Sequence, residues 1–445
     1  MAAIISPQRI RTPMRIVFSL LTLALAAALP AAASAPATVD AALVRAQKAH
    51  TPVLLDFHAP WCYSCYFMAT HVLNGPQWTA LEKNVIVADV DADSPDGATW
   101  MKKLEIKALP AYVVLNANGA ELGRILAEQP REKFYAQIDH IIASATTLDD
   151  FKREAAAGSI DATAIVLGSY QARSEGREGL DWYTSLPLKT RTVAHKDAHV
   201  ALWLDRLQLA RAANAKDDAG VVTAAQRVLA GDIGCDRPYV VDQLLDASEK
   251  TPKAKRRALL EPQRAALGQL LRKDVFIAKP TCADQRSTVI TAADVDAALG
   301  DHASETALLN RAIETTRQQL GGNFAKDRNL ADNLRVYLLR AKRTAELDAL
   351  YPQLIAAYPD DYVYAYRYGK SLLERGNAAQ ALPLLEQAAD TAYGENRLAV
   401  ATQRVKALKA LKRDKDAQKV VADALEQNGQ WFPKQVAQLK AALKS

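Results

Sequence analysis

The chain has 445 residues, of which 49% are hydrophobic and 24% are charged, and its formal net charge is +6. A soluble chain of this length predicts two or three domains with ample core material. Three positive charges, on Arg9, Arg11 and Arg15, lie in a segment that we expect to be removed. The remaining charge of about +3 is too small to indicate binding to nucleic acid or to an anionic membrane.

Residues 1–35 have the order of a secretory signal peptide. Basic residues precede an apolar run from Ile16 to Leu29, and small residues follow Pro30. The alternative is a membrane anchor, but a span needs roughly 20 apolar residues, more than this run supplies. We therefore expect an exported, periplasmic protein whose mature chain has no membrane span.

Residues 38–146 alternate short β-like runs with helical stretches, which predicts an α/β domain with a mixed sheet covered on both faces. The hairpin is indicated by Asn118-Gly119, which suits a tight turn. The expected elements are, in order, a helix over 38–48, a strand over 52–58, a helix over 65–73, a strand over 85–90, a helix over 100–104, strands over 111–115 and 121–126, and a helix over 130–142.

From 150 to 445 leucine and alanine recur with helical periodicity, which predicts an all-α region of helical repeats. Helical hairpins are expected at 198–231, 290–320 and 330–357. The clearest unit, 362–393, places small and large residues as a tetratricopeptide helix pair does, at Gly369, Leu372, Gly376, Ala381, Leu385 and Ala388. A degenerate copy follows with Ala417, Val421 and Ala424. We therefore interpret the region as tetratricopeptide-like, an architecture that commonly binds peptides.

Two cysteines, Cys62 and Cys65, follow directly on a predicted strand and stand two residues apart. At a helix N-terminus, free N–H groups and the helix dipole stabilise a thiolate on the first cysteine. The second lies one turn further on and can resolve a mixed disulfide. Asp56, in the apolar strand before them, is placed to accept the proton of the second thiol. The pattern predicts a redox-active dithiol.

Other sites share this cysteine spacing. Haem attachment needs a histidine directly after the second cysteine, where Tyr66 stands, and a zinc site needs two further ligands, for which His58 and His71 are not suitably arranged. A structural disulfide would close a very small loop of little stabilising value. No metal, nucleotide or flavin site is evident. We therefore expect no cofactor beyond the Cys62–Cys65 pair, and an electron donor that is another protein or a small thiol.

The segment from about 50 to 145 resembles the thioredoxin family, and it is most similar to the periplasmic thioredoxin-like domain of transmembrane thiol:disulfide interchange reductases. The resemblance covers under a quarter of the chain. The matching motifs are Val53-Leu54-Leu55-Asp56-Phe57, Ala59-x-Trp61-Cys62-x-x-Cys65, Asp89-Val90-Asp91, Leu109-Pro110-Ala111-Tyr112-Val113-Val114-Leu115 and Asn118-Gly119.

The resemblance implies a thioredoxin fold in which Cys62 is the nucleophile, Cys65 is the resolving thiol and Asp56 is the buried proton acceptor. Pro110 matches the cis-proline of the family, which leaves the backbone of Leu109 free to pair with a substrate strand. A trans proline that opens an edge strand is the alternative.

Trp61 and Tyr63 complete, with Leu109, the substrate-binding residues that we expect. Tyr63-Ser64 differs from the dipeptides of cytosolic thioredoxins and of strong periplasmic oxidants. No charged group of the motif is placed to hold a very low thiol pKa, which favours a reductant or isomerase over an oxidase.

Three further residues have two interpretations each. His58 either assists proton transfer or packs as family residues at that position do, and we favour packing. Cys235 and Cys282, in the helical region, either form a structural disulfide or act as separate thiols. An even cysteine count in an exported chain favours the disulfide.

The sequence therefore predicts a periplasmic thiol–disulfide oxidoreductase that acts on protein thiols and disulfides, with a helical region that binds clients or a partner. The alternative is an envelope scaffold or holdase, in which the helical repeats bind partners and the thioredoxin-like domain only docks.

Overall fold

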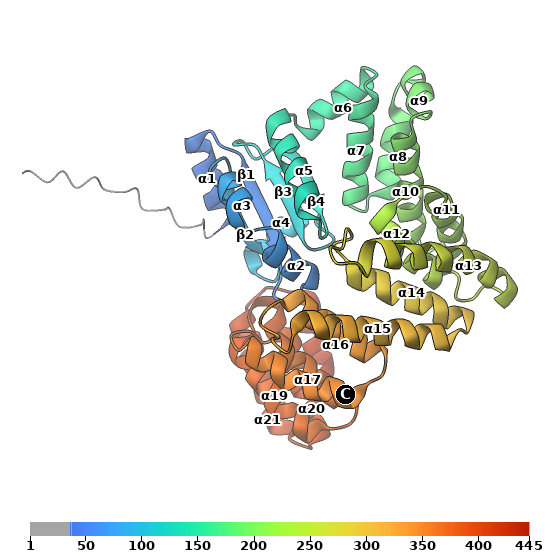
Figure 1. The fold of residues 1–445 in the computed structure, drawn as a ribbon. Coiled ribbons are helices and arrows are strands. Elements are labelled where there is room, and N and C mark those ends of the chain that lie inside the picture. The colour runs from blue at the N-terminus through green and yellow to red at the C-terminus, as the bar shows by residue number, and fades with distance from the viewer. Residues whose placement is uncertain (1–35, 37, 445) are drawn as a thin grey trace, which may run out of the picture. The chain divides into compact units, whose positions relative to one another are not determined.

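The chain begins with an α/β domain and continues as a long all-helical region (Figure 1). The structure, a computed structural model, describes residue 36 and residues 38–444, so the expected signal peptide lies outside the described residues. Residues 36–445 form one compact unit, and the predicted boundary between two domains therefore stays a prediction.

The α/β domain is built on a mixed four-stranded sheet with the order β2-β1-β3-β4. Strand β1 pairs in parallel with β2 and antiparallel with β3, and β3 pairs antiparallel with β4. The elements are α1 (Val39–Ala49), β1 (Val53–His58), α2 (Tyr63–His71), α3 (Gly75–Leu81), β2 (Ile86–Asp91), α4 (Pro95–Lys103), β3 (Ala111–Leu115), β4 (Glu121–Leu126) and α5 (Arg131–Ser144).

Successive side chains of β1 point to opposite faces of the sheet, and each face is covered by a different set of helices. Val53, Leu55 and Phe57 pack with residues of α1 and α4. Leu54 points to the opposite face, where it packs with residues of α2, α3 and α5. The predicted α/β arrangement with helices on both faces is confirmed, and its central strand carries Asp56 to the start of the cysteine helix.

Two differences from the predicted elements have local causes. Helix α3 was not expected, and it begins at Gly75 with Pro76 in its first turn. Helix α4 begins at Pro95 rather than near residue 100. The Ser94 side chain caps α4 by accepting a hydrogen bond from the Gly97 N–H at 2.9 Å.

The remainder of the described chain is helical, as predicted. Its elements are α6 (Leu148–Ala156), α7 (Ile160–Ala172), α8 (Gly176–Ser185), α9 (Leu188–Ala194), α10 (Ala198–Asn214), α11 (Asp218–Ala230), the 3₁₀ helix η1 (Gly234–Asp236), α12 (Arg237–Ala247), α13 (Lys253–Leu270), the π-helix η2 (Leu271–Val275), α14 (Gln285–Leu299), α15 (His302–Leu320), α16 (Arg328–Arg340), α17 (Thr344–Ala357), α18 (Val363–Glu374), α19 (Ala378–Thr391), α20 (Gly394–Ala410), α21 (Asp414–Asn428) and α22 (Pro433–Lys444).

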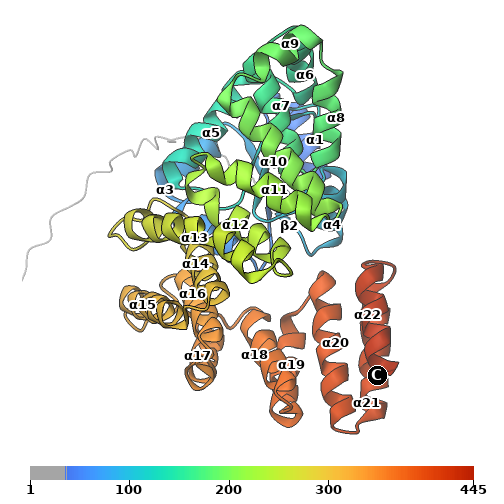
Figure 2. The same cartoon turned by 90° about the vertical axis from the view of Figure 1, so that its right-hand side faces the viewer.

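Helices α18 to α22 pack successively side by side (Figure 2). In the pair α18–α19, a Cβ on Gly369 would lie 2.8 Å from the Leu385 side chain, so this approach requires glycine. Ala381, Leu385 and Ala388 are fully buried. These are the packing positions expected of the clearest repeat unit, and its assignment as tetratricopeptide-like stays an interpretation.

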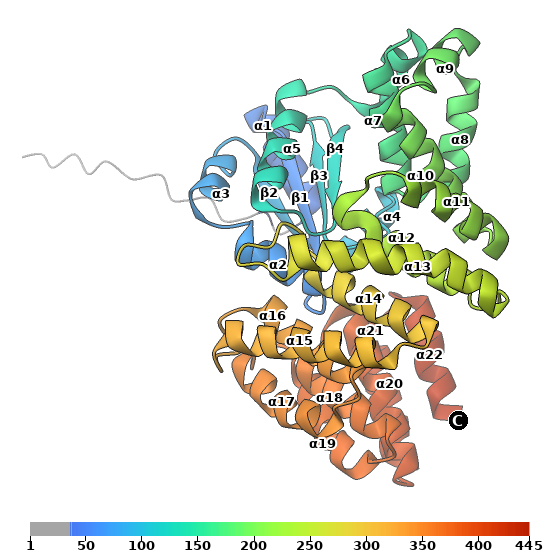
Figure 3. The same ribbon diagram turned by 45° about the vertical axis from the view of Figure 1, so that its right-hand side comes forward.

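The helical region packs directly against the cysteine helix. Helix α16 contacts α2. The start of α14 also approaches α2, because Asp284, which precedes α14, contacts Tyr63 (Figure 3). No helix within the described residues is long and apolar enough to cross a membrane. The helices that meet α2 supply part of the site described next.

Candidate active site

The cysteine pair lies where the central strand β1 passes into α2. Cys62 is the N-cap residue of α2, and a disulfide joins it to Cys65. The Cys62 Sγ accepts a hydrogen bond from the backbone N–H of Cys65 at 3.1 Å. Because this helix end carries free N–H groups and the positive end of the dipole, it favours a thiolate on Cys62 once the pair is reduced.

Both cysteines are nearly enclosed, since 4% of Cys62 and 8% of Cys65 is exposed. They pack with Ala59 and Ala92, and Met101 and Leu109 border this cluster. Met101 and Leu109 are the partly exposed apolar residues that lie beside the pair.

Leu109 lies in the loop before β3. The peptide bond between Leu109 and Pro110 is cis, and the Pro110 carbonyl accepts a hydrogen bond from the Ala127 N–H at 3.0 Å. The backbone N–H and C=O of Leu109 make no hydrogen bond within the part of the chain that the structure describes. They are therefore free to pair with an extended segment.

A groove of about 470 Å³ lies beside the cysteine cluster, and both regions of the chain line it. Most of its lining residues are apolar or aromatic, and Asp93, Lys107, Arg367 and Glu395 add charged groups of both signs. The α/β domain supplies Trp61, Ala92, Asp93, Met101, Lys107, Ala108 and Leu109, and the helical region supplies Tyr362, Val363, Tyr366, Arg367, Glu395, Asn396 and Ala399.

Trp61 is held in this groove by Asp93. The Trp61 Nε1–H donates to the Asp93 carboxylate at 2.8 Å, and the Asn396 side chain of α20 donates to the same oxygen at 2.7 Å. Burial raises the pKa of Asp93 to about 6, although these hydrogen bonds favour its charged form. The helical region thus orients an indole that remains 42% exposed.

Asp56 occupies β1 between β2 and β3, as predicted for a buried proton acceptor. Its Oδ1 is buried and has no hydrogen-bond partner among the described residues. Burial raises the pKa of Asp56 from its ordinary value of 3.8 to about 7, against the opposing effect of the His58 charge. A carboxyl with a pKa near 7 can both accept and return a proton at neutral pH.

His58 pairs with Asp89 on the neighbouring strand. Burial alone would lower the pKa of His58, but this ion pair raises it to about 9, so the imidazole is charged at neutral pH. This placement agrees with the favoured packing interpretation, and it adds an electrostatic effect on Asp56.

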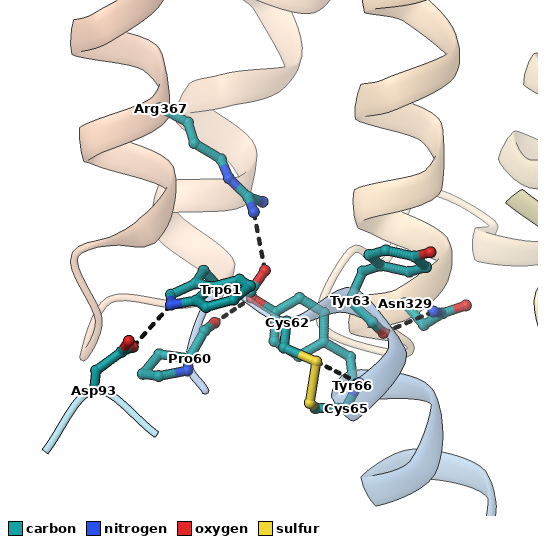
Figure 4. Close-up of a disulfide and its surroundings, with 9 residues drawn as sticks. All are labelled: Pro60, Trp61, Cys62, Tyr63, Cys65, Tyr66, Asp93, Asn329 and Arg367. Atoms are coloured by element: carbon teal, nitrogen blue, oxygen red, sulfur yellow. Dashed lines mark hydrogen bonds between the residues drawn. A yellow bond between two sulfur atoms is a disulfide. The ribbon is translucent and has the colours of Figure 1, made fainter. Parts of the chain in front are cut away.

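The helical region also contacts the turn that holds the cysteines (Figure 4). The Asn329 side chain donates to the Tyr63 carbonyl at 2.9 Å, and Arg367 donates to the Trp61 carbonyl at 3.0 Å. The Tyr66 hydroxyl donates to the Pro60 carbonyl within the turn. The carbonyls on either side of Cys62 are therefore both bonded to helical-region side chains.

The Tyr63 ring lies against the helical region. Its hydroxyl donates to Asp284 at 3.2 Å, and the Arg286 guanidinium lies over its face. Tyr63 is thus engaged by α14 and the residue that caps it. Its substrate contact stays a prediction, as do those of Trp61 and Leu109.

A buried carboxylate gathers three arginines next to this turn. Asp332 of α16 is 1% exposed and accepts from Arg286 at 2.8 Å, Arg335 at 2.8 Å and Arg367 at 2.6 Å. Burial would raise the pKa of Asp332, but the three guanidinium groups hold it well below its usual range. Arg367 therefore reaches both this cluster and the Trp61 carbonyl.

Cys235 and Cys282 are joined by a disulfide in the helical region. Cys282 is 1% exposed and belongs to the main helical core, whereas Cys235 is exposed. Two residues after Cys282, Asp284 caps α14 and meets Tyr63. The bridge thus anchors a loop that reaches the cysteine turn.

Sequence reasoning missed Asn329, Arg367 and Asn396, because each lies more than 250 residues from the motif that it contacts. One signal was available in α16, whose polar residues Asn329, Asp332, Asn333 and Arg335 stand among leucines and are buried. Buried polar residues on a helix indicate a specific partner. The described residues hold no group of three or more histidine, cysteine or acidic side chains arranged for a metal ion.

The α/β domain is similar in sequence to known proteins. A family model described as thioredoxin-like matches residues 34–117. The thiol:disulfide interchange protein DsbD of Neisseria meningitidis serogroup A is 33% identical over 103 residues, which are 22% of this chain and 17% of that protein. The chain carries a domain of the thioredoxin family.

Two further matches fall on this thioredoxin-family domain. The thiol:disulfide interchange protein TxlA of Synechococcus elongatus is 28% identical over 94 residues, 20% of this chain and 47% of that protein. A thioredoxin from Thermus thermophilus, solved in solution, is 30% identical and matches 23% of this chain and 83% of its own, with a TM-score of 0.22. The chain thus spans 17% of the length of the Neisseria relative and under half of the Synechococcus relative.

Proposed function

We propose that this protein is a thiol–disulfide oxidoreductase that acts on protein disulfides through Cys62 and Cys65. The observation that carries the proposal is that Cys62 is the N-cap residue of α2 and Cys65 follows one turn later. A groove lies beside the two cysteines, and the Leu109 backbone that lines it has hydrogen-bonding groups that are free within the described part of the chain. The names of the relatives, which are thiol:disulfide interchange proteins, support it.

The exchange proceeds in two balanced steps. The Cys62 thiolate attacks one sulfur of a client disulfide, which forms a mixed disulfide and releases the other client sulfur as a thiolate. Cys65 loses its proton to Asp56 and attacks Cys62, which releases the second client sulfur and forms the Cys62–Cys65 disulfide. The client gains two electrons, and an upstream thiol donor must return two electrons to the pair.

We further propose that the protein is exported to the periplasm and works as a reductant or isomerase. The signal-like order of residues 1–35 supports export. A client segment would lie in the groove between Leu109 and α18, so that the helical region contributes to client binding. The apolar and aromatic lining from both regions supports this placement.

Two single substitutions test the activity. Cys62→Ser should abolish reduction of a generic protein disulfide, because the nucleophile is lost. Cys65→Ser should instead trap clients as mixed disulfides with Cys62, visible on non-reducing gels and reversed by dithiothreitol. A double Cys62→Ser/Cys65→Ser variant is the matched control and should trap nothing. Unchanged turnover in Cys62→Ser would refute the proposal.

One observation favours a second candidate, an envelope scaffold or holdase whose thioredoxin-family domain only docks. The disulfide is nearly enclosed, and Asn329 and Arg367 brace the turn around it. A scaffold should keep its partner after both cysteines are replaced and should show no disulfide reductase activity. An oxidoreductase should lose client capture in the double variant.

A further inference from the structure

We infer that Arg367 and Asn329 are positioning residues for the chemistry of Cys62, and that through them the helical region shifts the redox equilibrium of the cysteine pair toward the reduced form. The inference rests on the proposed function, which it deepens by naming residues outside the thioredoxin-family domain that regulate its reactivity. It assigns to α16 and α18 a direct effect on the site, beyond binding clients.

The contact made by Arg367 is specific in its geometry. Its Nη2 donates to the Trp61 carbonyl at 3.0 Å (Figure 4). Its Nη1 donates to Asp332 at 2.6 Å. The Trp61 carbonyl carbon is bonded to the backbone nitrogen of Cys62. One nitrogen of the guanidinium is therefore fixed by Asp332, while the other lies on the peptide group that joins Trp61 to Cys62.

Asn329 holds the other side of Cys62. Its amide donates to the Tyr63 carbonyl at 2.9 Å, and its own carbonyl accepts from Asn333 at 3.2 Å. Asn329 is 5% exposed, so this hydrogen bond is shielded from water. The two contacts together hold the first turn of α2 in place. The position of the Cys65 N–H, which donates to the Cys62 sulfur, depends on the orientation of this turn.

The cluster that Asp332 forms with its three arginines carries a positive excess. Asp332 is one carboxylate shared by three guanidinium groups. Burial raises the pKa of Glu128 well above its usual range. Charged or titratable groups around the turn include Asp56, His58, Asp93 and Glu128 from the α/β domain, Asp284 and Arg286 at α14, Arg328, Asp332 and Arg335 of α16, Asp361 before α18, and Arg367 of α18. Lys107 and Glu395 line the groove beside Trp61 together with Arg367.

A nearby cation favours the reduced state for a simple reason. Reduction by glutathione converts the neutral disulfide and two glutathione thiols into the dithiol and glutathione disulfide, with two electrons passing to the cysteines. When Cys62 of this dithiol ionises, its proton passes to solvent and the reduced site carries a thiolate, whereas the disulfide carries no charge. The Arg367 guanidinium, which is hydrogen-bonded to the carbonyl of the residue before Cys62, interacts favourably with this thiolate and not with the neutral disulfide, so it raises the equilibrium constant for reduction.

The test measures that equilibrium constant in full-length protein against glutathione redox buffers at fixed neutral pH. Arg367→Gln should lower the constant for reduction by roughly tenfold, because one partly shielded charge is lost. Arg367→Lys keeps the charge and should stay within about threefold of the parent. Arg375→Gln is the matched control, since it removes a guanidinium from the end of the same helix where it pairs with Asp348 at 2.7 Å, and it should leave the constant unchanged.

Asn329→Ala keeps every charge and should lower the equilibrium constant for reduction about threefold, because the hydrogen bond to the Tyr63 carbonyl is lost. This variant replaces Arg367→Gln as the test if Arg367→Gln does not fold. The inference is overturned if Arg367→Gln matches Arg375→Gln within twofold, or if it shifts the equilibrium toward reduction. It is equally overturned if the only foldable variant, Asn329→Ala, is unchanged. Failure of the proposed function looks different, because Cys65→Ser would then trap no client whatever the equilibrium with glutathione.

Discussion

Replacing Asp56 by asparagine should stabilise the oxidised protein at alkaline pH and not at acidic pH. The structure buries the Asp56 Oδ1 on the central strand without a hydrogen-bond partner among the described residues. Burial raises the pKa of this carboxyl from 3.8 to about 7. Asparagine has nearly the same shape and never ionises, so it removes the cost of a buried charge and little else.

The sign and size follow from proton linkage. Because the folded-state pKa lies above that of the unfolded chain, the stabilising effect of the protonated carboxyl is complete below about pH 4 and is lost as the pH rises through about 7. Each pH unit in this window costs the wild type up to about 1.4 kcal/mol. Between about pH 4.5 and about pH 8, Asp56→Asn should gain about 3 kcal/mol over wild type. The residue as a whole is only half-buried although its Oδ1 is enclosed, which reduces the expected gain to about 2 kcal/mol.

The assay is urea denaturation of both proteins at these two pH values, with the Cys62–Cys65 disulfide intact so that no thiol titrates. The comparison of variant with wild type cancels the titrating groups that do not interact with Asp56. His58 does interact with it, but its pKa is raised to about 9, so it is charged at both pH values. Asp390→Asn, at an exposed position of α19, is the matched control and should show no pH-dependent difference. If the stability difference between Asp56→Asn and wild type is the same at both pH values, the buried carboxyl is not ionising as argued.

Two further predictions concern the helical region. Replacing Cys235 and Cys282 together by serine should lower the free energy of unfolding by about 4 kcal/mol, because their bridge spans 47 positions; an unchanged urea midpoint would show that the bridge adds no stability. Gly394→Ala would place a Cβ 2.0 Å from the Asp93 backbone oxygen, so it should destabilise by about 1–3 kcal/mol and speed proteolysis near α20. Wild-type stability and digestion in this variant would contradict that packing.

Much of the thioredoxin-family domain could be predicted from sequence because its signals are local. Strand β1 alternates side chains between two buried faces, and its end leads directly into the cysteine motif. Strand, turn and helix are therefore all encoded between residues 53 and 71. Asp56 stood out as an ionisable residue in an apolar strand. Helix α3 was missed because a short amphipathic turn that begins with Gly75 and Pro76 reads equally well as a loop.

The surroundings of the site could not be predicted in the same way. Asn329 and Arg367 reach the cysteine turn, and Asn396 reaches Asp93, across sequence separations of 266 to 306 residues. Helical periodicity identifies the buried face of each helix, but it does not say which distant surface that face meets. The buried polar residues of α16 indicated that a specific partner exists. Only the folded arrangement identifies that partner as the cysteine turn.

These distant contacts change how the direction of electron flow should be judged. The expectation of a reductant rested on a motif without nearby charge, whereas the structure places the Arg367 guanidinium on the carbonyl next to Cys62. That cation favours the thiolate and so acts toward a more oxidising pair, by an amount that an excised thioredoxin-family domain would not show. The reduction potential must therefore be measured on the full chain. A reduction potential near roughly −270 mV would make the protein a reductant despite Arg367. A potential near roughly −120 mV would make it an oxidant, in which the helical region raises the potential above that of the excised domain.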